Sequence, residues 1–147
     1  MLCILGKQYE ACKYLESVCD WSNALLMSKL SLSEDKKNET LTKYAQYLNS
    51  KKCIIQSASV YVVIGNFDKA IEVFFGSRVR HMSYLLLHFF EKSGFKSSLS
   101  DHVKLAIKLD FARFLFDNRL VRESIEFCDR LGMDGKSLKQ ELEILAT

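Results

Sequence analysis

The sequence predicts an all-α fold: antiparallel helix hairpins stacked as a degenerate α-solenoid of the tetratricopeptide (TPR-like) sort, with about nine helices. Apolar residues recur with a helical period of about 3.6 almost throughout the 147 residues, and strand-like alternation is nearly absent. Proline is missing altogether, which favours unbroken helices because proline disrupts helix interiors. With 48% apolar residues, the chain can form one domain, residues 1–147, with a substantial core.

The first third of the chain is expected to form three helices. The first covers about Lys7 to Val18, and Asp20 can cap a second that runs from Trp21 to Leu30. Ser33 precedes a third helix, whose opening Glu and Asp residues suit the positive end of the helix dipole.

The middle of the chain contains one ambiguous segment. Cys53 to Ile64 is rich in Val and Ile and in isolation also fits a strand. A single strand would have nothing to pair with, so we expect a helix. Gly65 and Asn66 then form a stop and a turn before the helix of residues 67–75.

Four further helices complete the prediction. They are expected at Arg78 to Lys92, from Ser100-Asp101 to about Asp117, at Leu120 to Leu131, and at Ser137 to Ala146.

A recurring pairing of large and small residues indicates how these helices pack. Phe67 is followed by Ala70 and then by Phe74, so the small residue lets a neighbouring helix approach while the aromatic residues fill the gaps beside it. Similar sets occur at Trp21 with Ala24, at Tyr9 with Cys12, and at Leu120 with Ser124 and Phe127. The pattern is typical of the inner seams of helix hairpins. A closed, non-repeating helical bundle is the alternative.

No motif of catalysis or cofactor binding is present. Phosphate-binding glycine loops, G-x-S-x-G and H-E-x-x-H are all absent from the sequence. His81 and His88 are separated by two helical turns, about 10.5 Å along the axis, which is too far for one zinc ion. We therefore expect no enzyme activity, no cofactor and no metal site.

The five cysteines are Cys3, Cys12, Cys19, Cys53 and Cys128. Their odd number and the absence of C-x-x-C pairs argue against a disulfide framework. We expect them to stay reduced and to lie mostly buried on apolar helix faces.

The net charge of +3 is too small to indicate a dedicated nucleic-acid binder. The clearest basic groupings are Lys51-Lys52 and the pair Arg78 and Arg80. Cations at the start of a helix oppose its dipole, a cost that an acidic partner could offset. These four residues are the candidate partner-binding residues, and a solvated surface is the alternative.

Two stretches of the sequence carry a family resemblance. The segment CILGKQYEACKYLESVCDWSNAL resembles the start of the C-terminal helical region of the WD-repeat-domain protein eleven family. The resemblance resumes in LDFARFLFDNRLVRESIEFCDRLGMDGKSLKQELE, and residues 33–75 between them match loosely. The matching residues are Cys3, Leu5, Ala11, Cys12, Tyr14, Leu15, Ser17, Trp21 and Ala24, and later Asp110, Phe111, Ala112, Arg113, Leu115, Gly135, Lys136, Leu138, Glu141, Leu142 and Glu143.

The resemblance implies that the chain is the C-terminal fragment of a longer protein with two β-propellers. Proteins of that family act at the trans-Golgi network, with a FAM-ninety-one-type partner, in the capture of endosome-derived vesicles. The implied function is a non-enzymatic protein-interaction scaffold, cytoplasmic or peripheral at the trans-Golgi network or vesicles. No transmembrane segment is expected, because no apolar run approaches the length that spans a bilayer.

Three alternatives remain open at this point. A segment of a coatomer-like or intraflagellar-transport-like subunit would have a similar architecture, and self-association could replace a separate protein partner. A helical-repeat nucleic-acid-binding module is disfavoured, because the chain has no periodic set of base-reading residues.

Overall fold

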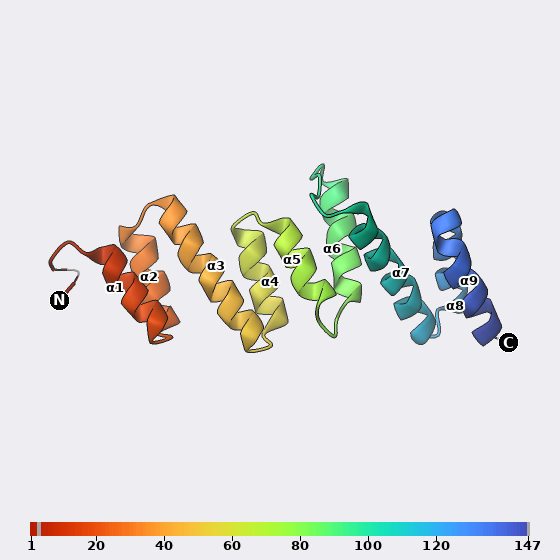
Figure 1. Ribbon diagram of the computed structural model, residues 1–147, viewed down its shortest axis with the longest axis horizontal. Helices are drawn as coiled ribbons and strands as arrows, with labels where there is room; N and C mark the ends of the chain where they lie inside the picture. The colour runs from red at the N-terminus through yellow and green to blue at the C-terminus, as the bar shows by residue number, and fades with distance from the viewer. Residues whose placement is uncertain (3, 147) are drawn as a thin grey trace. The chain divides into compact units, whose positions relative to one another are not determined.

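The computed structural model describes residues 1–2 and 4–146, and all the regular elements among them are helices. These helices are α1 (Gln8–Ser17), α2 (Trp21–Ser31), α3 (Glu34–Ser50), α4 (Ile54–Val63), α5 (Phe67–Phe75), α6 (His81–Lys92), α7 (Asp101–Asp117), α8 (Val121–Arg130) and α9 (Met133–Leu145) (Figure 1). The predicted all-α class is confirmed, and the ambiguous segment after Cys53 is helical.

Two helices begin more than one residue away from the predicted start. α6 begins at His81 and not at Arg78, because the Ser77 hydroxyl accepts a hydrogen bond from the Val79 N–H (3.1 Å) and holds a turn. α9 begins at Met133, four residues before the expected Ser137. Its first turn contains Gly135, although glycine has a low helix propensity.

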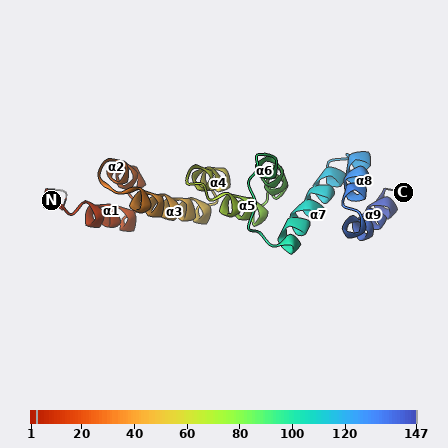
Figure 2. The ribbon, with the colours of Figure 1, turned by 90° about the horizontal axis from the view of Figure 1, so that it is seen from above.

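The chain forms two compact units, Met1–Ala70 and the part from Ile71 onward, and the boundary between them falls inside α5. In the first unit, α1 packs on α2, α2 on α3, and α3 on α4. Seen from above, α1 and α3 form one layer of this unit, and α2 and α4 form the other (Figure 2). These are two stacked antiparallel hairpins.

The second unit continues the same kind of packing. α6 packs on α7, α7 on α8 and α8 on α9, and α7 also touches α9. A buried core of Ala112, Cys128, Leu138 and Leu142 joins α7, α8 and α9. Within both units the helices pack mainly on their neighbours in the chain, as the predicted solenoid of stacked hairpins requires.

Five of the turns between helices share one hydrogen-bond pattern. In each, a residue with positive φ follows the helix, and its N–H bonds to the carbonyl three residues back. The next N–H bonds to the carbonyl five residues back, which makes a Schellman motif. The residues with positive φ are Cys19, Lys52, Gly65, Gly94 and Arg119.

These turns set a fixed register for the small residues of the seams. Cys12 and Ala24 stand seven residues before and five residues after Cys19. The same spacings from Lys52, Gly65 and Arg119 give the pairs Ala45 and Ser57, Ala58 and Ala70, and Ala112 and Ser124. All eight of these residues are buried.

In three of these pairs, one member donates a hydrogen bond to the carbonyl of the other. The Ser57 hydroxyl donates to Ala45 O (2.8 Å), and the Ser124 hydroxyl donates to Ala112 O (2.7 Å). The Cys12 thiol lies 3.5 Å from Ala24 O. The small side chains therefore bring the two helix backbones together and also bond them.

Candidate interaction surfaces

Lys51 and Lys52 lie exposed in the turn between α3 and α4. The Lys51 ammonium lies 5.6 Å from the centroid of the Tyr47 ring, a cation–π distance. Lys52 is the positive-φ residue of its turn, with φ 63°, and it is exposed. Both ammonium groups are available to a partner from this loop.

Arg78 and Arg80 lie exposed in the turn between α5 and α6. Arg80 already has partners within the second unit. Its guanidinium lies 3.4 Å from an Asp110 carboxylate oxygen and 6.0 Å from the Phe75 ring centroid. The side chain is nevertheless 60% exposed, so the ion pair leaves most of it in solvent.

Aromatic contact joins the first hairpin of this unit to the second. The Trp21 ring, in the first turn of α2, lies 5.4 Å from the Tyr44 ring and 5.3 Å from the Tyr47 ring on α3. Trp21 is half-buried, as is Phe67. The reason is that each lies at the edge of its hairpin, in the first turn of its helix.

A polar cluster joins α1 to α3 beside this contact. Glu16 of α1 accepts hydrogen bonds from the Thr40 hydroxyl and the Lys43 ammonium, both at 2.9 Å. Lys43 also pairs with Glu39 at 2.8 Å, and the Tyr9 hydroxyl donates to Glu39 at 3.0 Å. These carboxylates raise the pKa of Lys43 through hydrogen bonds, first from Glu39. The cluster fixes the position of α1 on α3.

In the second unit, aromatic rings again connect the start of one helix to the end of the next. His81 stacks on Phe114 of α7 with ring centroids 4.0 Å apart. Tyr84 stacks on Phe111 at 4.2 Å, and Phe127 of α8 meets Tyr84 edge-on at 5.1 Å. Burial raises the pKa of Tyr84. His81 thus has a packing role.

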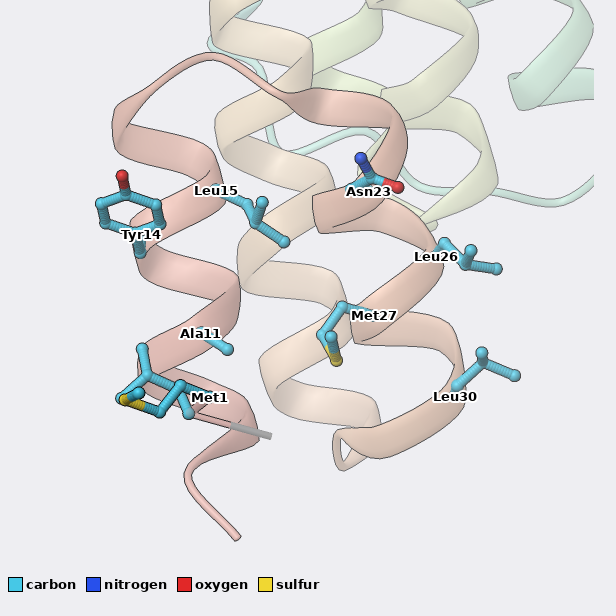
Figure 3. Close-up of a pocket in the computed structure, with 9 residues that line it drawn as sticks. Met1, Ala11, Tyr14, Leu15, Asn23, Leu26, Met27 and Leu30 are labelled. Carbon is cyan, nitrogen blue, oxygen red and sulfur yellow. The ribbon is translucent and has the colours of Figure 1, made fainter. Parts of the chain in front are cut away.

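An open apolar groove lies between α1 and α2 and has a volume of about 530 Å³. Ala11, Leu15 and Met27 point into the space between the two helices, while Tyr14 and Leu30 lie on opposite sides of it (Figure 3). Tyr14 is 62% exposed and Leu30 is 74% exposed. Apolar side chains therefore form an accessible surface at this position, which sequence reasoning did not identify.

The cysteines differ in their environments. Burial raises the pKa of the Cys12 and Cys128 thiols, which makes both poor nucleophiles. Cys53 is half-buried and Cys19 is exposed, so the expectation that the cysteines are mostly buried is wrong for Cys19. Its place in the Schellman turn after α1 turns it towards solvent. Cys3 lies outside the described residues.

Residues 1–2 and 4–146 contain neither a group of metal ligands nor a helix that could cross a membrane. No three His, Cys, Asp or Glu side chains there are grouped to hold a metal ion. None of the helices described for this part of the chain has both the length and the apolar character of a bilayer-crossing segment.

The fold and its surfaces define a helical-repeat segment: stacked hairpins with exposed apolar and basic positions. The chain is 27% identical over 146 residues to WD repeat-containing protein 11 of Danio rerio, and 27% identical over 147 residues to the protein of that name from Homo sapiens. It is 26% identical over 146 residues to that of Mus musculus.

Each of these matches covers 97% of this chain, and together they confirm the predicted resemblance to the WD-repeat-domain protein eleven family. The chain spans about 12% of the length of these curated relatives. No protein-family model matches it.

Proposed function

We propose that the chain is a non-enzymatic protein-interaction scaffold, the C-terminal helical domain of a longer WD-repeat protein that acts in vesicle tethering and endosome-to-Golgi trafficking. The observation that carries this proposal is the similarity along nearly the whole chain to WD repeat-containing protein 11. A fold of stacked helix hairpins is suited to binding other proteins. The two compact units belong, in this proposal, to one helical domain.

The proposed partner is a FAM-ninety-one-type subunit or a second copy of the chain, and the proposed location is the cytoplasm, peripheral at the trans-Golgi network or vesicles. Lys51, Lys52, Arg78 and Arg80 are the proposed contacts for acidic groups of a partner. Their exposure and position support this proposal, because each residue lies in a loop between two helices, where the turns of a solenoid project. Single surface charges contribute little to binding, so the four must be changed together.

The test is affinity purification of the full-length parent protein, read by mass spectrometry. Three forms are compared: the wild type, a form lacking this segment, and a charge-reversed form with Lys51→Glu, Lys52→Glu, Arg78→Glu and Arg80→Glu. The segment deletion should lose a specific set of partners, and the charge-reversed form should lose the same set while keeping its melting temperature.

A matched control reverses four other exposed lysines, Lys7, Lys29, Lys96 and Lys136. The net change in charge is the same, so the control should keep the partners that the test variant loses. Equal recovery of partners by all forms would refute the scaffold role. Equal loss in the two charge-reversed forms would refute the assignment of the four residues.

A further inference from the structure

The aromatic contacts between hairpins occupy the same register in both units. Tyr44 and Tyr47 stand eight and five residues before the positive-φ residue Lys52, and both contact Trp21. Phe111 and Phe114 stand eight and five residues before Arg119. They stack on Tyr84 and His81, which lie in the first turn of the preceding helix. We call the surface formed by these two positions the receiving face of a hairpin, because aromatic side chains from the preceding helix stack on it.

The same two positions exist on α1. Counting back eight and five residues from Cys19 gives Ala11 and Tyr14, and both line the apolar groove between α1 and α2. In Figure 3 the next helix of the chain, α3, lies behind α1 and α2, and the groove is viewed from the other face. Met1 and Leu2, from the segment before α1, also line this groove, but no aromatic ring from another helix among the described residues stacks on Tyr14. The corresponding faces of α3 and α7 are filled by such rings.

The second helix of this hairpin adds apolar surface where another hairpin has charge. Leu26 and Leu30 stand seven and eleven residues after Cys19, and they are 56% and 74% exposed. The same offsets from Arg119 give Glu126 and Arg130 on α8. A terminal repeat of a solenoid needs a polar outer face, and this face is apolar.

We propose that this face docks a further helix hairpin of the same kind, which places an aromatic side chain from the first turn of its second helix against Ala11 and Tyr14. The established stacking of Trp21 on α3 and of Tyr84 on α7 is the model for this contact. The curated relatives are long enough to contain such a hairpin, because this chain spans 12% of their length. The inference does not depend on the trafficking role.

The same register also predicts the charge of one side chain on the docked hairpin. The position nine residues before the positive-φ residue forms an ion pair with the preceding hairpin or turn in both units: Lys43 with Glu16, and Asp110 with Arg80. On α1 this position is Glu10, which is exposed. The docked hairpin therefore presents a basic group near Glu10.

The experiment uses the chain's own hairpin as the probe. A tandem variant carries a second copy of residues 7–33 inserted before Lys7 of the full chain, and the original Trp21 is changed to Phe. Because the sequence has one Trp, the copied Trp is then the sole indole. Docking should shift its emission to shorter wavelength, protect it from iodide quenching, and raise the melting temperature by at least about 3 °C.

Two substitutions in the original hairpin test the proposed geometry. Tyr14→Ala should return the copied Trp to solvent-like emission and remove the gain in melting temperature. Glu10→Lys should increase the gain, because the copied Glu16 would then face a cation, as it faces Lys43 in the natural stack.

Three results would overturn the proposal. A copied Trp with solvent-like emission would show that the face does not receive a hairpin. Emission that Tyr14→Ala leaves unchanged would show that the copy folds without docking. A natural chain that sediments as a dimer, and that Tyr14→Asp makes monomeric, would show that a second copy is the occupant instead.

Discussion

At Gly135 the backbones of α8 and α9 approach so closely that no side chain fits between them. A Cβ atom added there would overlap the Cys128 carbonyl oxygen and lie 3.0 Å from the Leu131 Cβ. Both of these neighbours are constrained, since one is backbone and the other is the first atom of a side chain. This close approach explains why α9 tolerates a glycine in its first turn.

We predict that Gly135→Ala lowers the free energy of unfolding by about 1–3 kcal/mol, because the two helices must separate to admit the methyl group. Urea unfolding followed by circular dichroism measures the change. Gly76→Ala is the matched control, since its nearest neighbour, Glu72 O, lies at an ordinary contact distance of 3.5 Å. An equal denaturation midpoint for both variants would contradict the close approach of α8 and α9.

Glu39 provides a pH-dependent contribution to stability. The Lys43 ammonium, and after it the Tyr9 hydroxyl, lower the pKa of Glu39 through hydrogen bonds. A carboxyl whose pKa is lower in the folded state stabilises the fold above its unfolded pKa of about 4.3. That contribution is lost as the pH falls through the folded pKa.

We therefore predict that the urea midpoint of the wild type falls more steeply between about pH 5 and pH 3 than that of Glu39→Gln. The glutamine cannot titrate, so its variant lacks this part of the acid sensitivity. Glu34→Gln serves as a control, because Glu34 forms only an exposed pair with Lys37 within one helix. Parallel pH profiles for the wild type and Glu39→Gln would show that the contact with Lys43 does not lower the pKa of Glu39 in the folded state.

Among the elements, the five Schellman turns share their geometry but not their residue type. Three of the positive-φ positions carry a side chain, namely Cys19, Lys52 and Arg119, with φ of 58°, 63° and 63°. The left-handed conformation costs a residue with a Cβ roughly 1–2 kcal/mol relative to glycine. Part of this cost is offset because glycine gains more entropy in the unfolded chain.

We predict that Lys52→Gly and Arg119→Gly each stabilise the chain by about 0.5–1 kcal/mol, observed as a rise in melting temperature. The reverse change, Gly65→Lys, should lower the melting temperature, since it introduces the same strain at an equivalent turn with open space around it. A loss of stability in both glycine variants would indicate that the side chains contribute contacts that outweigh the strain.

Helix number and type could be predicted from the sequence because burial on one helix face leaves a periodic signal. The small residues at the seams could also be predicted, since Ala24, Ala70 and Ser124 each accompany a large apolar neighbour. The common register could not, because it is counted from residues with positive φ, and Lys52 and Arg119 look like ordinary surface residues in the sequence. Glycine-based turn rules therefore miss three of the five turns.

The candidate surfaces were less predictable than the helices. Exposure of Lys51, Lys52, Arg78 and Arg80 follows from their charge, but the Asp110 partner of Arg80 is 30 residues away and has no local sequence signal. The apolar groove was missed because Tyr14 and Leu30 belong to ordinary amphipathic patterns. Whether such residues are covered depends on which hairpin packs beside them.

At the scale of the whole molecule, stability is expected to be local. Within each unit the helices pack mainly on their neighbours in the chain, and the division between the two compact units falls inside α5. In such a repeat architecture, the stability of one region depends on its own helices and on the adjacent interface. One unit can therefore open at a lower free energy than the other, and native-state hydrogen exchange would detect this difference.

We predict that a cavity in one unit raises exchange in that unit first. Leu138→Ala removes a buried side chain from the core of α7, α8 and α9, at a cost of about 2–5 kcal/mol. Amides of these three helices should exchange faster, while those of α3 and α4 change much less. Leu48→Ala, in a buried position of α3, is the mirror variant and should give the opposite pattern. Mass spectrometry of peptic fragments at neutral pH would resolve the two units. If either variant accelerated exchange equally along residues 4–146, the chain would unfold as one cooperative body, and nearest-neighbour packing would not describe its stability.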